Sequence, residues 1–514
     1  MARGVALVLG SILYALALPP FDWSICGWVA LAPLLVALRG LRTLPAFGYG
    51  AAYGALCSCT VGMSWIAPAI ARFFDVHPAV GVGLACVYAV LVWGIPFGTF
   101  AAGAVVLLRR ERSVVARLAI PALWVATELF RGRLVGQPWA LLGYTQHAQL
   151  AIVQVAALTG VYGVSFLLAF TSTVLAEMPA LLHAGHRRQA LLTLALPVPL
   201  VAALGLAGTL VLLRGPDGGF AAQRVTVVQT NVEPAREWTR AYTDRQVMAH
   251  IQATAGLSTT ARPMLVVWPE NAVPRYLETE PFLGAQLASI ASRERADLLF
   301  GAPRYEGGRT YNSVRLITAA GRDGGSYDKQ RLVPLAERTP IGGDDPAPRS
   351  DDPGQFSVGT GPSTLRSFVT LGVSICHEIL FPELIGRSVA DGAALLVNVS
   401  NDGWLDGGHG IASRQHFAMA VLRSVETRRY LVRAATTGVS GVIDPFGRVV
   451  DVLPPGAAGT VSTSVAGRTA ITPYVRMGDV FAFACVLAAV GALAGRRSAA
   501  VRAVPRLASA SRTS

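Results

Sequence analysis

One cysteine of this sequence differs from the other five in its surroundings. Cys376 ends the apolar run 371–376 and is followed by polar His377 and Glu378, whereas the other cysteines lie in or beside long apolar segments. A thiol at the end of a strand is held rigidly and remains accessible, which suits a nucleophile. Cys376 is also the only cysteine between residues 220 and 470, so no disulfide partner lies near it in the sequence. We interpret Cys376 as a candidate nucleophile; an inert buried thiol is the alternative.

Two further residues could assist this thiol. Lys329 is the only lysine among 44 lysines and arginines, which indicates a position that needs a compact, orientable ammonium group. Glu270 follows a Trp-Pro pair at the end of the apolar run 264–268, so its carboxylate should leave a sheet at the same kind of edge as Cys376. Chance survival on a surface loop is the alternative for the lysine, and a salt bridge or helix cap is the alternative for the glutamate.

Together these residue types match the needs of a thiol that attacks an ester. The nucleophile is the thiolate, so a base must take the thiol proton, and Glu270 is a candidate for that task. The attack creates a negative oxygen, which Lys329 and a backbone N–H beside Cys376 could stabilise. Metal-binding and nucleotide-binding motifs are absent from the sequence, and His409 and His416 are isolated, so we interpret both as structural. We expect neither a metal nor a cofactor.

The segment that carries these residues has the pattern of a layered α/β domain. Short β-rich runs alternate with helical stretches between residues 220 and 470. We expect strands at 224–230, 264–268, 297–302, 313–318, 371–376, 394–399, 431–436 and 439–443. We expect helices at about 237–257, 282–295, 381–391 and 413–428.

The rest of the chain is too apolar for a soluble protein. Its mean hydropathy is +0.47 and only 15% of its residues are charged. Apolar blocks long enough to cross a bilayer predict eight membrane spans. These are at about 4–20, 25–39, 44–67, 79–108, 117–131, 157–181, 190–213 and 476–495. We expect a seven-span bundle at residues 1–215, an outer domain at 220–470, the eighth span at 475–496 and a disordered tail at 497–514.

A net charge of +13 is common in proteins that bind nucleic acid, but the positions of the arginines argue against such a partner here. Arginines are dense in every second connection between the predicted spans and sparse in the others. This alternation is typical of the positive-inside rule. It predicts that both termini are cytoplasmic and that the segment between the seventh and eighth spans lies on the outer side. We expect a bilayer, and no nucleic acid, as the partner. The dense connections contain Arg39 and Arg42, then Arg109, Arg110, Arg112 and Arg117, then Arg187 and Arg188, and finally Arg496, Arg497, Arg502 and Arg506.

Several short motifs in this order resemble the nitrilase superfamily, and the flanking spans resemble its membrane-embedded branch, the apolipoprotein N-acyltransferases. The resemblance covers nearly the whole chain. Its motifs are Trp268-Pro-Glu270; Lys329-Gln-Arg-Leu-Val-Pro followed by Glu337; Ile375-Cys376-His-Glu378 with Phe381-Pro-Glu383; and Asn398-Val-Ser-Asn-Asp-Gly-Trp404. Two departures are visible: Leu335-Ala336 replace the family's Phe-Gly, and His377 replaces its Tyr.

The resemblance implies a fold and a set of roles. Residues 220–470 should form an αββα sandwich. Glu270 should be the general base, Lys329 the group that stabilises the oxyanion and Cys376 the acylated nucleophile. Glu337 should position the lysine. Glu378 and Trp238 match positions that the family uses near the pocket.

The resemblance also implies a reaction and its place in the cell. A phospholipid, for which we expect phosphatidylethanolamine, should acylate Cys376, and the acyl group should then pass to the N-terminal amine of a diacylglyceryl lipoprotein. The protein should lie in the cytoplasmic (inner) membrane of a bacterium. Side chains expected to guide the acyl chains include His377, Phe381, Trp404 and Trp139, although aromatic residues at this depth also serve as membrane anchors.

Two other interpretations of the sequence remain open. One is a membrane-tethered amidase or hydrolase of the same superfamily, in which water resolves the thioester. The other is a transporter or scaffold that carries an inactive domain. Of the acidic residues in the predicted spans, we consider only Glu128 a candidate for a transport path.

Overall fold

The computed structural model describes residues 1–109, 114–215, 219–235, 238–260, 264–334, 336–337, 355–406 and 410–501. The predicted tail from residue 502 onward, His409 and the departure at Leu335 lie outside the described residues. Residues 497–501, which the sequence assigned to the tail, continue the last helix.

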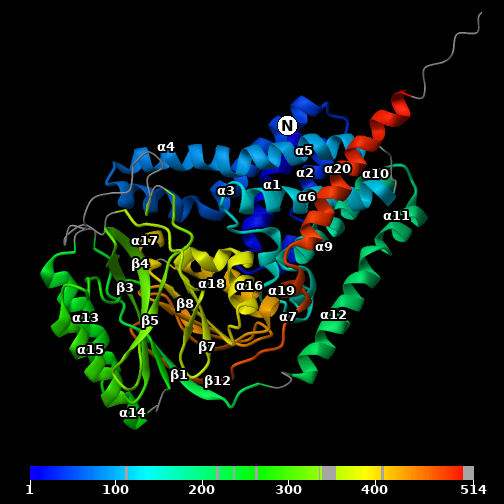
Figure 1. Cartoon of the computed structure of the whole chain (residues 1–514). Coiled ribbons are helices and arrows are strands. Elements are labelled where there is room, and N and C mark those ends of the chain that lie inside the picture. The colour runs from blue at the N-terminus through cyan, green and yellow to red at the C-terminus, as the bar shows by residue number, and fades with distance from the viewer. Residues whose placement is uncertain are drawn as a thin grey trace, which may run out of the picture.

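Helices build the first 214 residues and the C-terminal end of the described chain (Figure 1). The longer ones are α1 (Ala2–Leu16), α3 (Thr43–Phe74), α4 (Pro78–Tyr88), α5 (Ile95–Leu108), α6 (Val114–Arg133), α9 (Val161–Leu175), α12 (Pro197–Arg214) and α20 (Val480–Val501). A π-helical turn, η2 (Ala89–Gly94), joins α4 to α5. The shorter ones are η1 (Ser24–Trp28), α2 (Ala32–Leu38), η3 (Leu142–Gln146), α7 (Leu150–Val153), α8 (Ala156–Thr159), α10 (Met178–His183), α11 (Arg187–Leu194) and α19 (Pro473–Met477).

Among the described residues, three helical segments are long and apolar enough to span a membrane. They are Pro78–Leu108, Val161–His183 and Arg187–Arg214, and α3 adds a fourth candidate as a bent pair of helices. The predicted span at 25–39 contains only the short η1 and α2. The predicted span at 117–131 lies in α6, which carries charged residues along its length. A helical membrane region is therefore present, and the count of eight spans stays a prediction.

Two six-stranded sheets form the α/β region. All eight predicted strands are present, and four more pair with them. The first sheet has the order β12-β1-β2-β3-β4-β5 and the second β11-β10-β9-β8-β7-β6. The strands are β1 (Gln223–Gln229), β2 (Leu265–Val267), β3 (Asp297–Glu306), β4 (Arg309–Ile317), β5 (Asp323–Asp328), β6 (Thr364–Arg366), β7 (Thr370–Ile375), β8 (Leu395–Ser400), β9 (Leu431–Ala435), β10 (Ser440–Ile443), β11 (Val449–Leu453) and β12 (Gly459–Val465).

The two sheets pack face to face between two layers of helices (Figure 1). Valines on both inner faces, among them Val227, Val267 and Val397, form one apolar core. A second core joins the first sheet to α13 (Arg240–Thr254) and α15 (Pro281–Glu294). On the other side lie α16 (Pro382–Ala390) and α18 (Ile411–Thr427). The described order is therefore the αββα sandwich expected from the sequence. Short pieces complete it: α14 (Leu257–Thr260), η4 (Cys376–Leu380) and α17 (Gly403–Asp406).

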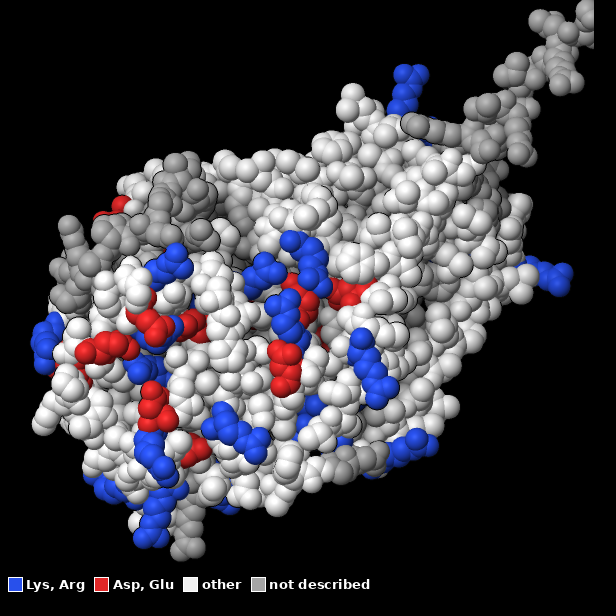
Figure 2. All heavy atoms as spheres, in the orientation of Figure 1, with Lys and Arg blue, Asp and Glu red and all other residues white. Residues whose placement is uncertain are grey.

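Helix α18 is buried on both of its faces. Fifteen of its 17 residues are buried, and its apolar side chains share one core with the membrane helices. The second helical layer of the sandwich therefore packs between the second sheet and the bundle. In Figure 2 the charged side chains gather over the α/β region, while the visible surface of the helical region is almost uncharged.

Candidate active site

The candidate residues follow strands that end at one edge of the sandwich. Glu270 follows β2, Lys329 follows β5 and Cys376 follows β7. Gly301 on β3 lets the turn that carries Glu270 approach, because a Cβ at Gly301 would come within 2.6 Å of the Glu270 Cα. The two sheets thus bring together residues that are more than 100 positions apart in the chain.

Lys329 lies between two carboxylates. Its Nζ is 2.7 Å from Oε1 of Glu337 and 3.3 Å from Oε1 of Glu270, and its side chain is only 1% exposed. Burial alone would lower the pKa of Lys329, but the negative charges of Glu270 and Glu337 outweigh burial and hold that pKa above its ordinary value. The lysine is therefore a fixed positive charge. The structure brings Glu270, Lys329 and Glu337 together, and their catalytic roles stay predictions.

Cys376 occupies a strained position beside this cluster. Its φ is 53°, in the left-handed region that non-glycine residues rarely adopt. Its carbonyl oxygen accepts a hydrogen bond of 3.2 Å from the side-chain amide of Asn398. The side chain is half-buried. The turn from β7 into η4 therefore holds the thiol at the end of the strand, where a nucleophile was expected.

The surroundings of Cys376 keep its thiol protonated in the resting protein. Burial raises the pKa of Cys376 to about 12, the negative charge of Glu270 adds to the rise, and the positive charge of Lys329 offsets part of it. A preformed thiolate, as in a cysteine–histidine ion pair, is therefore not the resting state. This arrangement suits proton removal by a neighbouring base at the moment of attack.

Glu378 connects the cysteine to the lysine. Its Oε1 accepts hydrogen bonds from the backbone N–H groups of Gln330 and Arg331, at 2.7 and 2.9 Å. Its Oε2 accepts from the backbone N–H of Ile375 and the hydroxyl of Tyr327, at 2.7 and 2.9 Å. Burial raises the pKa of Glu378 to about 7, and the three backbone N–H donors and the charge of Lys329 offset part of that rise. Four donors leave this carboxylate little capacity for chemistry, so it holds the segment around Lys329 against the end of β7.

A second group of buried charges lies near Cys376. Arg433 Nη2 contacts both carboxylate oxygens of Asp402, at 3.0 and 2.8 Å, and Arg433 also donates to Oδ1 of Asn398. His416 Nδ1 is 3.1 Å from Oδ1 of Asp402. Burial would raise the pKa of Asp402, but the charge of Arg433 lowers it below its ordinary value. Through Asn398 this group, which we call the Asp402 network, fixes the backbone of Cys376. No catalytic role was predicted for its members from the sequence.

One residue of the site was missed by the sequence analysis. Asn312 on β4 is 1% exposed, and its side-chain amide donates to Oε1 of Glu270 at 2.8 Å and to Oε1 of Glu337 at 2.9 Å. An asparagine in the middle of a strand-forming stretch carries no local signal of this role. Only the pairing of β4 with β3 and β5 places it beside both carboxylates.

The predicted substrate-binding residues make different contacts in the structure. The ring of His377 packs against Phe381 with centroids 5.5 Å apart, and the Arg331 guanidinium lies 5.4 Å from the Phe381 centroid. Burial and the charge of Lys329 hold the pKa of His377 well below its ordinary value. Trp238 is buried just before α13, and no hydrogen bond between described residues joins it to Glu270, Lys329 or Cys376.

The two other tryptophans lie where the sandwich meets the bundle. Trp404 on α17 packs against Phe73 of α3, with centroids 6.0 Å apart. Trp139 is buried, and its indole N–H donates to Gln415 Oε1 on α18 at 2.9 Å. Its ring lies 5.5 Å from that of His416. Trp139 and Trp404 therefore have a structural contact each, and their binding of substrate stays a prediction.

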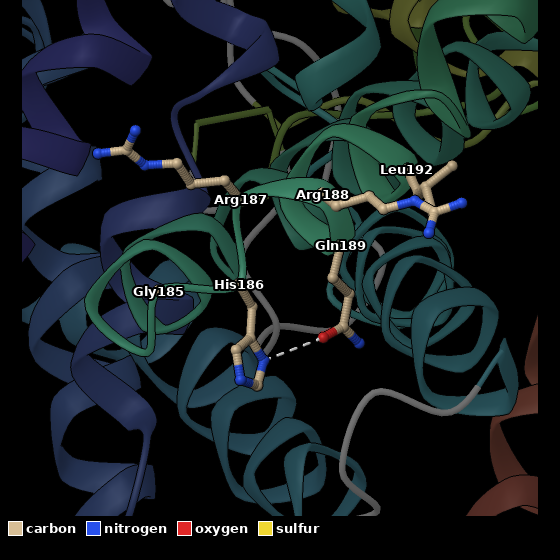
Figure 3. Close-up of a pocket in the computed structure, with 6 residues that line it drawn as sticks. All are labelled: Gly185, His186, Arg187, Arg188, Gln189 and Leu192. Carbon is tan, nitrogen blue, oxygen red and sulfur yellow. Dashed lines mark hydrogen bonds between the residues drawn. The ribbon is translucent and has the colours of Figure 1, made fainter.

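A hollow elsewhere in the molecule contains none of these residues. It measures about 450 Å³ and is lined by Gly185, His186, Arg187, Arg188, Gln189 and Leu192, where α10 meets α11 (Figure 3). Its arginines are two of those from which the sequence predicts the cytoplasmic connections, and that topology stays a prediction. Among the described residues, no group of three or more His, Cys, Asp or Glu side chains is arranged to hold a metal ion.

Comparison with known proteins assigns both parts of the chain. Residues 10–174 match the family model of the apolipoprotein N-acyltransferase N-terminal domain, and residues 224–473 match the carbon-nitrogen hydrolase family. An apolipoprotein N-acyltransferase of Geobacter metallireducens is 33% identical over 506 residues, which cover 95% of each chain. The chain belongs to the apolipoprotein N-acyltransferase family.

Other relatives have the same extent. An apolipoprotein N-acyltransferase of Pseudomonas paraeruginosa is 33% identical over 526 residues and covers 96% of each chain. Among solved structures, an amidase of the nitrilase superfamily from Nesterenkonia is 19% identical, covers 56% of this chain and 98% of its own, and superposes with a TM-score of 0.38. The bacterial relatives and the apolar helices together make this chain a bacterial membrane protein.

Proposed function

We propose that this protein transfers a fatty acyl chain from a phospholipid to the N-terminal amine of a diacylglyceryl-cysteine lipoprotein, by way of a thioester on Cys376. One observation supports the chemistry above all others. Glu270 and Lys329, a candidate base and a fixed positive charge, form a buried pair whose charges act on the Cys376 thiol. The full-length match to the family supports the substrates.

The first half-reaction acylates the cysteine. Glu270 takes the proton of the Cys376 thiol as the sulfur attacks the carbonyl carbon of the sn-1 ester. Lys329 stabilises the negative oxygen of the tetrahedral intermediate. The bond between the carbonyl carbon and the glycerol oxygen then breaks, Glu270 returns the proton to that oxygen, and lysophospholipid leaves. Phosphatidylethanolamine is the donor we propose.

The second half-reaction regenerates the thiol. The neutral α-amine of the lipoprotein attacks the thioester carbon, and Lys329 again faces the negative oxygen. The carbon–sulfur bond breaks as the amide forms. Glu270 accepts the proton lost by the amine and passes it to the sulfur, so the carboxylate ends the cycle as it began.

The position of the site suits substrates that stay in the membrane. Moving an acyl chain from lipid into water costs about 0.8 kcal/mol per CH₂, and the helical layer next to the site packs on the bundle. We place the α/β domain (220–470) on the outer side of the cytoplasmic membrane, between the bundle of residues 1–215 and the last span at 475–496, with both termini cytoplasmic. The donor and acceptor can then react at the bilayer surface without leaving it.

The proposal is tested by mass spectrometry of the purified protein after incubation with phospholipid. We expect a hydroxylamine-labile acyl mass on the peptide that contains residue 376. Cys376→Ala should lose this mass, whereas Cys485→Ala, which removes a thiol of the last helix, should retain it. An acyl group that remains in Cys376→Ala would overturn the proposal. Free fatty acid without an acylated acceptor peptide would instead favour a membrane-tethered hydrolase, which shares the same three residues.

A further inference from the structure

Asn312 lies where the polar groups of the site meet. Its side-chain nitrogen donates to Oε1 of Glu270 and to Oε1 of Glu337, the same two oxygens that contact the Lys329 ammonium. Its backbone carbonyl accepts the backbone N–H of Lys329 at 2.9 Å. A single strand residue therefore contacts the candidate base, the second glutamate and the lysine.

The orientation of this amide follows from its neighbours. If the amide were reversed, its oxygen would face two carboxylate oxygens, which is repulsive. In the orientation described, both hydrogens of the nitrogen are used, and the amide oxygen is buried with no hydrogen-bond partner among the described residues. The cost of burying this unpaired oxygen is offset by the two N–H groups that Asn312 places between the carboxylates.

The distances show that the two carboxylates have different nearest hydrogen-bond donors. Lys329 is closer to Glu337, at 2.7 Å, than to Glu270, at 3.3 Å. The closest donors of Glu270 are neutral: the Asn312 amide and the backbone N–H of Asn401, each at 2.8 Å. A neutral donor holds a carboxylate in place without cancelling its charge. Two carboxylates and one ammonium leave the cluster with one excess negative charge, which a base requires.

We propose that Asn312 is a positioning residue for the acyl transfer, which keeps Glu270 and Glu337 apart and assigns the lysine to Glu337. Glu270 is thereby free to act as the base, and Lys329 remains where the oxyanion forms. Without the amide, the two carboxylates compete for the lysine and one of them takes a proton. This inference rests on the roles proposed above for Glu270, Lys329 and Cys376.

The test measures thioester formation on residue 376 against pH for the full-length protein with phospholipid. Asn312→Ala, which loses the donor, and the isosteric Asn312→Asp, which replaces it with a third acidic group beside two carboxylates, should slow it roughly ten- to hundredfold at pH 7. The acid limb of the profile should move to higher pH by about one unit, since a carboxylate without its donor is protonated more readily. Asn312→Ser, which retains one donor, should lie between these variants and the unsubstituted protein.

Asn231→Asp is the matched control, because the side-chain amide of Asn231 donates only to the Gly456 carbonyl and none of the described contacts of Asn231 reaches Glu270, Lys329 or Cys376 directly. It should leave both rate and profile unchanged. Rates are compared per folded protein, with thermal unfolding as the measure of folding, so that a loss of stability is not counted as a loss of rate. If the acid limb is unchanged in all three Asn312 variants, the inference about Asn312 is overturned and the proposed function is not. Absence of any thioester in the unsubstituted protein overturns the proposed function instead.

Discussion

Two clusters of buried charge lie near Cys376, and they are built differently. In the cluster of Glu270, Lys329 and Glu337, two carboxylates share one ammonium group, and the closest donors of Glu270 are neutral. In the Asp402 network, one carboxylate meets one guanidinium through two contacts. The first cluster has an excess of negative charge, and the second is balanced.

This difference in charge indicates a catalytic role for the first cluster and a structural role for the second. A balanced pair such as Asp402 and Arg433 holds neighbouring backbone in place, but it has no capacity to move a proton at neutral pH. The excess charge near Glu270 raises the pKa of Cys376 and leaves a carboxylate that can accept the thiol proton. Substitutions in the first cluster should therefore change rates, whereas substitutions in the second should first change stability.

The largest expected effect is on rate. Glu270→Gln keeps the size and an acceptor for Asn312 but removes the base, so acyl transfer should fall about 10²- to 10⁴-fold. The melting temperature of this variant in detergent should change little. Glu278→Gln, on the surface of the same domain and paired with Arg315, is the control and should keep full activity. Activity retained in Glu270→Gln would assign the base to another residue.

The next effect should appear in stability. Asp402→Asn leaves the guanidinium of Arg433 buried without its carboxylate, which costs about 3–5 kcal/mol. The measurement is thermal or denaturant unfolding followed in detergent. Asp323→Asn replaces an exposed aspartate of β5 and should shift stability by less than about 0.5 kcal/mol. If the two variants had equal free energies of unfolding, the Asp402 network would not stabilise the fold.

A smaller effect concerns the resting state of the thiol. Because the pKa of Cys376 is raised to about 12, only a small fraction is thiolate at neutral pH, and that fraction grows about tenfold per pH unit. Alkylation of residue 376 by iodoacetamide, followed by mass spectrometry without lipid, should rise in this way from pH 7 to pH 10 without reaching a plateau. A plateau near pH 7 would indicate a preformed thiolate and contradict activation by Glu270.

The sequence predicted the parts of the site that follow strand ends. Glu270, Lys329 and Cys376 each stand next to an apolar run, and their residue types are unusual for their surroundings. Asn312 was missed because its role depends on contacts between strands and not on its neighbours in sequence. The Asp402 network was missed as a unit for the same reason, since its members come from β8, β9 and α18 and the loop after β8.

The fold was predicted where the hydrophobic pattern is strong. The eight expected strands have buried, β-branched cores, whereas all four missed strands lie at sheet edges, and β5 and β11 are also short and polar or exposed. The predicted spans were read from hydropathy alone, which cannot tell a membrane helix from an apolar segment that breaks into short helices. Residues 25–39 are such a segment.

The smallest effect is expected from a substitution at Trp139, and its measurement distinguishes two roles of this residue that the sequence left open. Trp139→Phe keeps the aromatic ring but removes the hydrogen bond to Gln415, and a buried acceptor without its donor costs about 1–3 kcal/mol. If Trp139 only joins the bundle to α18, the melting temperature should fall while the KM for phospholipid is unchanged. If the indole also binds the acyl donor, the KM should rise. Trp23→Phe, at a tryptophan that is 59% exposed, should change neither value, and a shift of the same size there would remove any special role of Trp139.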